Sequence, residues 1–171
     1  MLTVGSLNSI YVQQLIKNKK LDKKELLSKN EKYIITTVEQ PFEGVEKALV
    51  IAGSDCRGTI YGIYELSKQL GVSPWYWWMD VPVVKRTEAY VLPGLYTDGE
   101  PAVKYRGIFL NDEAPCLTSW VKQYYGTNFG DHRFYAQVCE LILRLKGNFL
   151  WPAMWGWAFY ADDPLNNVSS I

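Results

Sequence analysis

The sequence predicts an α/β protein: a small α/β domain followed by the first βαβ unit of an incomplete (β/α)8 barrel, since a barrel is one common closure of a parallel sheet. Two observations support this class. Short β-branched or apolar runs alternate with longer segments in which apolar residues recur at helical spacing. In addition, four prolines between residues 74 and 101 separate two such series, which places a boundary near Gly99. The predicted domains are therefore residues 1–98 and 99–171.

The first domain is predicted to contain helices, two strands and a further helix. Surface helices are expected over residues 8–17 and 17–32, where a few apolar residues lie among Lys, Asp and Glu. Strands are expected over residues 33–39, which are rich in β-branched side chains, and 48–52, a continuous apolar run that should be buried on both faces. A helix should follow over residues 59–70, because its apolar spacing is helical and a glycine stands at its end.

The second domain is predicted to begin with a strand at residues 105–110, a helix at 134–145 and a strand at 148–154. Lys146 and Gly147 stand where a basic last turn and a left-handed cap are favoured. Two parallel strands and one helix can neither cover both faces of a sheet nor close a barrel, so we expect a truncated barrel. The alternative is a small α+β protein whose last segment wraps its core.

The composition argues against several functional classes. Lys+Arg and Asp+Glu both number 18, so no broad basic surface for nucleic acid or anionic membrane is expected. No apolar run approaches the roughly 20 residues of a membrane-spanning helix, and the N-terminus lacks the pattern of a secretory signal. Cys56, Cys116 and Cys139 form no CxxC pair, which indicates packed thiols rather than a zinc or disulfide framework.

Two other segments have competing interpretations. The turn at residues 53–62 resembles the start of a phosphate loop, but Thr59 stands where lysine is required. A structural turn with Asp55 and Arg57 as hydrogen-bonding struts is expected there, and an anion site is the alternative. Residues 73–80 contain four aromatic side chains, which predict either an interdomain plug or a platform that stacks on sugars.

The most informative polar residues follow the strand at 105–110. Asn111, Asp112 and Glu113 stand at its C-terminal end, where βα barrels collect their site residues. Two adjacent carboxylates cannot both point the same way, so one can face a cleft while the other holds a neighbouring loop. The second strand brings Trp151 and Trp155 to the same end, and tryptophans beside carboxylates suit sugars. A solvated turn is the alternative.

Glycoside hydrolysis normally needs two carboxyl groups, and the spacing alone identifies no pair. Asp162 and Asp163 follow the second strand and should lie at the same end as the residues above. His132 is the single histidine and precedes a helix, so we interpret it as part of an N-terminal turn, with ligand binding as the alternative.

Three segments, AGSDCRGTIYGIYELSKQLGVSPWYWWMDVPV, VKYRGIFLNDEAP and LRLKGNFLWPAMWGWAF, resemble the family 115 glycoside hydrolases in order and separation. The resemblance extends over about residues 4–166. It implies an internal fragment that spans the end of an N-terminal α/β domain and the start of a (β/α)8 catalytic barrel. It further implies removal of glucuronic acid or 4-O-methyl-glucuronic acid linked α-1,2 to xylan, by inversion and without a metal or other cofactor.

The resemblance also implies roles for individual residues. Asp112, with Asn111 and Glu113, would bind the uronic acid or the attacking water, and Trp151 and Trp155 would wall the pocket. The general acid would come from barrel strands beyond Ile171, so this chain alone is expected to be inactive.

The expected partners are glucuronoxylan or its oligosaccharides, with neither nucleic acid nor membrane, and the full-length parent is expected to be capable of forming a homodimer. Parents of this family are often secreted or periplasmic. Trp157 departs from the polar residue expected in its loop. The alternatives are a non-catalytic carbohydrate-binding module that uses the aromatic cluster and a structural interaction domain.

Overall fold

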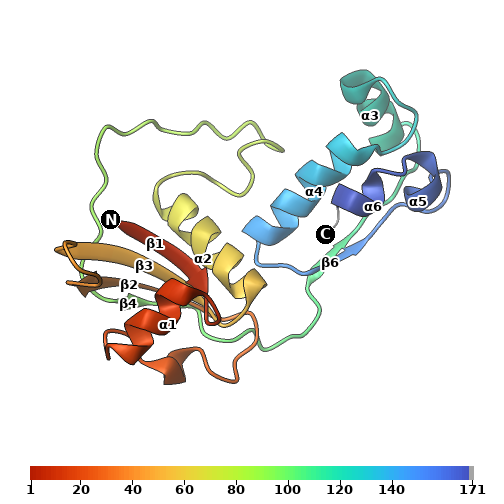
Figure 1. Ribbon diagram of the computed structural model, residues 1–171. Helices are drawn as coiled ribbons and strands as arrows, with labels where there is room; N and C mark the ends of the chain where they lie inside the picture. The colour runs from red at the N-terminus through yellow and green to blue at the C-terminus, as the bar shows by residue number, and fades with distance from the viewer. Residues whose placement is uncertain (170–171) are drawn as a thin grey trace. The chain divides into compact units, whose positions relative to one another are not determined.

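The computed structural model describes residues 1–169, which form two compact units (Figure 1). Unit 1 is Met1–Lys104, and unit 2 begins at Tyr105. The sequence placed the domain boundary slightly earlier, between residues 98 and 99. Each unit combines helices with strands, so the predicted α/β class holds for both.

Unit 1 is built on a four-stranded mixed sheet with the order β1-β3-β2-β4. Its strands are β1 (Leu2–Ser6), β2 (Tyr33–Glu39), β3 (Lys47–Gly53) and β4 (Leu95–Tyr96). β1 is parallel to β3, whereas β2 is antiparallel to both of its neighbours. β2 and β3 confirm the two predicted strands, and β3 is an interior strand, as its continuous apolar run requires. The sequence did not predict β1 or β4, because a short strand without clear alternation gives little periodic signal.

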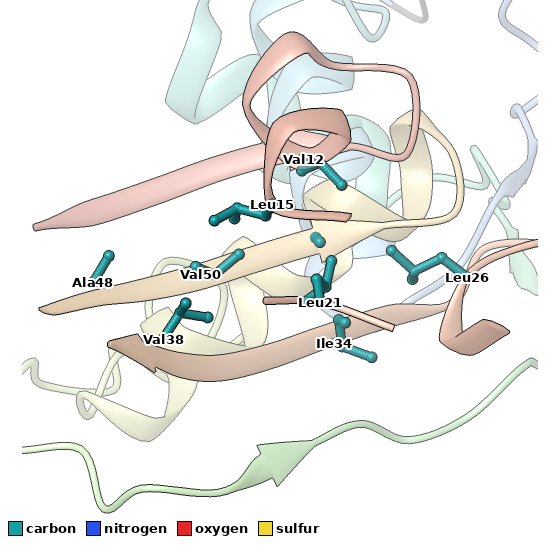
Figure 2. Packing of buried hydrophobic residues seen from close by; sticks show 9 residues of the cluster. Val12, Leu15, Leu21, Leu26, Ile34, Val38, Ala48 and Val50 are labelled. Carbon is teal, nitrogen blue, oxygen red and sulfur yellow. The ribbon is translucent and has the colours of Figure 1, made fainter. Parts of the chain in front are cut away.

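One face of this sheet packs against α1 (Ile10–Lys17) to form the core of unit 1 (Figure 2). Alternate residues of β2 and β3 point to this face, as the period of two along a strand dictates. Nine buried apolar side chains make up the cluster: Val12, Leu15, Leu21, Leu26, Ile34, Val38, Ala48, Val50 and Ala52.

The other face of the sheet packs against α2 (Cys56–Gln69), which confirms the helix predicted over residues 59–70. Ile51 of β3 lies between Val50 and Ala52, which face α1, and therefore points to the opposite side of the sheet. A side chain at Gly62 of α2 would place its Cβ 2.6 Å from Ile51 Cγ2, so helix and strand approach closely there. Gly71 follows the helix with φ +102°, a conformation that glycine adopts without strain.

The segment between α1 and β2 corrects the prediction of a helix over residues 17–32. Only one turn of 3-10 helix forms, at Lys23–Glu25. Lys19, Ser28 and Glu31 adopt φ values of 56°, 57° and 52°, and left-handed residues interrupt an α-helix. Lys and Glu favour helix intrinsically, but this segment lacks a continuous apolar stripe to pack against the sheet, so its buried leucines reach the core from turns instead.

The turn between β3 and α2 is closed by the protein's own carboxylate. Asp55 Oδ1 accepts the backbone N–H of Gly58 at 2.8 Å, and Asp55 Oδ2 accepts that of Glu31 at 2.6 Å. Arg57 forms an ion pair with the Glu31 carboxylate at 2.7 Å. Because the helix N-terminus is already capped, this geometry supports the structural turn rather than the anion site.

The aromatic segment at residues 73–80 forms turns within unit 1. Trp77 and Trp78 are half-buried and pack edge to face, with ring centroids 4.8 Å apart and planes at 79°. In this arrangement the edge of one ring covers the face of the other. The pair therefore favours a packing role over a flat stacking platform.

Unit 2 contains a two-stranded parallel sheet, β5 (Gly107–Phe109) and β6 (Phe149–Trp151). Its helices are α3 (Leu117–Tyr125), α4 (His132–Arg144), α5 (Phe159–Asp162) and α6 (Asn166–Ser169). Two parallel strands joined through α4 confirm the predicted βαβ unit, although both strands are shorter than expected. No helix among residues 1–169 is both long and apolar enough to cross a membrane.

Close backbone approach explains two glycines of unit 2. A Cβ at Gly107 would lie 1.7 Å from the carbonyl oxygen of Phe149 on the neighbouring strand, and a Cβ at Gly147 would lie 2.9 Å from that of Arg106. The left-handed residue after α4 is Lys146, with φ +59°. This corrects the expectation that Gly147 is the left-handed cap, since packing rather than dihedral angle selects glycine there.

The three cysteines are free, and two of them are not packed. Cys56 and Cys116 are exposed because they stand at the starts of α2 and α3, which corrects the prediction of three packed thiols. Cys139 is partly buried in α4, and this burial raises the pKa of its thiol.

Candidate functional site

The candidate site lies where β5 and β6 end, side by side. Phe109 pairs with Trp151 in the parallel register, and the next backbone N–H, of Leu110, donates to the Trp151 carbonyl at 2.9 Å. The chain therefore leaves both strands at the same edge of the sheet. The two half-exposed rings of Phe109 and Trp151 meet edge to face there, with centroids 5.5 Å apart.

Asp112 connects the two segments that leave this edge. Its Oδ2 accepts three successive backbone N–H groups, from Trp155 at 3.0 Å, Gly156 at 2.8 Å and Trp157 at 2.9 Å. Successive N–H groups that converge on one anion form a nest, and here the anion belongs to the protein itself. Asp112 is only 5% exposed, so its carboxylate is directed inward toward residues 155–157, which we call the 155–157 loop.

The two neighbours of Asp112 are exposed. Asn111 and Glu113 flank the buried carboxylate, so exposure alternates along these three residues as it does along an extended chain. The sequence predicted that one of two adjacent carboxylates faces a cleft while the other holds a loop. The structure identifies Asp112 as the one that holds the loop and leaves Glu113 facing outward.

The tryptophans of this region have different surroundings. Trp151 is 50% exposed, and its indole N–H donates to the Met154 sulfur at 3.1 Å. Trp155 is 75% exposed, whereas Trp157 is 5% exposed and packs edge to face on Phe134 of α4 at 5.8 Å. The predicted sugar-facing residues Trp151 and Trp155 are therefore accessible, and the unexpected Trp157 is a core residue that fixes its loop.

The two carboxylates after β6 also bind backbone groups. Asp162 accepts the N–H of Ala158 at 2.6 Å. Asp163 Oδ2 accepts the backbone N–H of His132 at 3.0 Å and lies 2.8 Å from His132 Nδ1. These hydrogen bonds, first from the His132 backbone and then from its ring, lower the pKa of Asp163 to about 2. His132 thus ties the start of α4 to the chain beyond β6, in line with its interpretation as part of an N-terminal turn.

The family resemblance implies that the general acid comes from barrel strands beyond Ile171. Ile171 lies outside the described residues, which are 1–169, so this assignment stays a prediction. Among the carboxylates that directly follow β5 and β6 in the described residues, Asp112, Asp162 and Asp163 accept backbone N–H groups.

An aromatic surface on α3 was not predicted from the sequence. Trp120 and Tyr124 stack with centroids 5.2 Å apart and planes at 17°, and Arg133 lies 5.4 Å from the ring centre of Tyr125. Burial raises the pKa of Tyr125 to about 12. The sequence did contain a signal for this helix, because Trp120 and Tyr124 are one helical turn apart and a glycine, Gly126, follows them. In the structure Gly126 ends the helix with φ +81°.

Asp131 caps α4 and remains engaged with its own helix. Its carboxylate accepts the backbone N–H groups of Arg133 and Phe134 and pairs with the Arg133 guanidinium. Burial opposes ionisation of Asp131, but the hydrogen bonds from Arg133 and Phe134 outweigh it and lower the pKa overall. Within residues 1–169, no three His, Cys, Asp or Glu side chains are grouped to hold a metal ion.

Comparison with known proteins bears on the family of this chain. Residues 98–170 match the model of glycosyl hydrolase family 115. Among curated proteins, none matches the sequence. Among solved structures, the chain is similar to BtGH115A, described as a family 115 4-O-methyl-α-glucuronidase with specificity for decorated arabinogalactans. The TM-score is 0.81 at 32% identity, over 99% of this chain and 22% of the other. The chain thus spans about a fifth of the length of that relative, and its residues 98–170 belong to glycosyl hydrolase family 115.

Proposed function

We propose that the chain forms part of an α-glucuronidase, a glycoside hydrolase that removes glucuronic acid or 4-O-methyl-glucuronic acid side groups from a polysaccharide. One observation supports this above all: both units align with a 4-O-methyl-α-glucuronidase at a TM-score of 0.81. The relative is described as a glucuronidase, which does not favour the alternative of a non-catalytic carbohydrate-binding module.

The proposed contribution of this chain is one side of the uronide pocket. The apolar face of a sugar ring can stack on an exposed indole, which Trp151 and Trp155 offer. Hydroxyl groups need polar partners, which the exposed Asn111 and Glu113 offer at the same edge of the sheet. In this proposal Asp112 belongs to the site through the loop that it holds.

The proposed reaction is hydrolysis of an α-1,2 linkage with inversion. An inverting glycosidase places its two carboxyl groups about 6.5–9.5 Å apart, so that one protonates the leaving oxygen while the other activates water. We propose that Glu113 supplies one carboxyl group and that a further strand of a (β/α)8 barrel supplies the general acid. The chemistry then needs only carboxyl groups and water.

Xylan and arabinogalactan are both candidate backbones. The relative is described with specificity for decorated arabinogalactans, whereas the family resemblance of the sequence implies glucuronoxylan. Release of 4-O-methyl-glucuronic acid from each polysaccharide should be measured with this chain and with a chimera in which it replaces the matching segment of BtGH115A. We expect release by the chimera, and Glu113→Gln should abolish it.

A folded chimera that releases no uronic acid from either polysaccharide would contradict the proposed function. Glu43→Gln is the matched control, because Glu43 is an exposed carboxylate of unit 1. The chimera that carries Glu43→Gln should release uronic acid at the same rate as the unaltered chimera.

A further inference from the structure

We propose that Asp112 is a positioning residue that acts on the sugar only through the 155–157 loop, and that Glu113 is the carboxylate that contacts the sugar. This proposal rests on the proposed function, since it divides the roles of two residues within that site. It replaces the expectation from sequence that Asp112 itself binds the uronic acid or water.

The first step is the occupancy of the Asp112 carboxylate. One oxygen already accepts three N–H groups at 2.8–3.0 Å, and the side chain is only 5% exposed. The residue is also held through its backbone, because the Thr118 hydroxyl donates to the Asp112 carbonyl. A carboxylate that already accepts hydrogen bonds from the protein and is shielded from solvent is poorly placed to accept them from a sugar.

The second step concerns what the carboxylate holds. Three successive N–H groups in an irregular loop need an acceptor, and Asp112 is the acceptor that all three share. The loop backbone is fixed between this contact and the buried ring of Trp157. The exposed indole of Trp155 projects from the same backbone, so the position of Trp155 depends on Asp112.

The third step is the direction of Glu113. Adjacent residues of an extended segment point to opposite sides, and the exposure pattern of Asn111, Asp112 and Glu113 follows this rule. With Asp112 directed to the 155–157 loop, Glu113 is the carboxylate of this segment that reaches solvent at the strand end.

The experiment uses the full chain and two readouts. Amide hydrogen exchange at residues 155–157 reports loop order, and calorimetric titration with a xylo-oligosaccharide bearing 4-O-methyl-glucuronic acid reports binding. Asp112→Gly should speed exchange of the three amides by about tenfold or more and weaken binding, because the nest loses its anion. Added formate should refill the nest and restore both. Asp112→Asn keeps an acceptor oxygen and should show smaller losses, and it serves as the test if the glycine variant does not fold.

Glu113→Gln should weaken binding while exchange at residues 155–157 stays unchanged, and the exposed control Glu43→Gln should change neither. Weaker binding by the Asp112 variants with unaltered exchange would overturn the proposal, because Asp112 would then contact the sugar directly. Recovery of amide protection by formate without recovery of binding would overturn it as well. If neither the unaltered chain nor its chimera with BtGH115A binds the uronide, the proposed function is contradicted, and the exchange data alone then decide whether Asp112 holds the loop.

Discussion

Trp155 and Trp157 stand two residues apart and should respond in opposite ways to truncation. Trp157 is 5% exposed and packs on Phe134 with ring centroids 5.8 Å apart. Trp155 is 75% exposed. We expect Trp157→Ala to destabilise unit 2, and Trp155→Ala to leave its stability almost unchanged while weakening the binding of a uronic acid oligosaccharide.

The size of the first effect follows from burial. Truncating a buried aromatic side chain to alanine costs about 3–5 kcal/mol, because the transfer of the ring from water is lost and a cavity remains. A unit of about 70 residues has a free energy of unfolding of about 3–10 kcal/mol. Trp157→Ala should therefore remove much or all of the stability of unit 2, whereas an exposed site such as Trp155 should change it by no more than about 0.5 kcal/mol.

Urea denaturation followed by far-ultraviolet circular dichroism measures both variants under the same conditions. Trp155→Ala is the matched control, since it removes the same side chain from the same loop. Equal free energies of unfolding for the two variants would refute the reasoning, because they would mean that the Trp157 indole does not belong to the packed interior. Titration with the oligosaccharide then separates a loss of binding from a loss of stability.

Three further changes test other contacts. Gly107→Ala should prevent the pairing of β5 with β6, because the new Cβ would lie 1.7 Å from the Phe149 carbonyl oxygen; an unchanged melting temperature would contradict this. Hydrogen bonds from His132 hold the pKa of Asp163 at about 2, below its ordinary 3.8, so their contribution to stability is present above pH 3.8 and is lost as the pH falls toward 2. The difference in melting temperature between wild type and Asp163→Asn should accordingly shrink over that range, and a constant difference would argue against the contact. Asp55→Ala should reduce the free energy of unfolding of unit 1 by about 1–2 kcal/mol through loss of the α2 cap, and a reduction below about 0.3 kcal/mol in urea denaturation would show that water replaces the cap.

Local patterns in the sequence were sufficient for the main elements. Each of these elements has a pattern within its own segment that indicates which residues are buried. The patterns are the β-branched run of β2, the continuous apolar run of β3 and the helical spacing in α2 and α4. Such patterns depend on neighbouring residues, so they can be recognised without knowledge of the fold. The same holds for the prediction that polar residues gather after β5, because parallel strands end at the same edge.

Elements without a strong local pattern could not be predicted in this way. The Lys-rich segment between α1 and β2 favours helix by composition, but packing against the sheet draws its leucines into turns. β4 has two residues and exists because β2 offers it an edge. In both cases a contact with a distant segment outweighs local preference.

The tertiary structure alone decided which of Asp112 and Glu113 points inward. The sequence determined that two adjacent carboxylates follow β5 and that they must point to opposite sides. It did not determine which one points inward, because that depends on the 155–157 loop, whose first residue lies 43 positions further along the chain. Only when β5 and β6 pair does this loop bring three N–H groups to one carboxylate, and this hydrogen bonding holds Asp112 inside and leaves Glu113 outside.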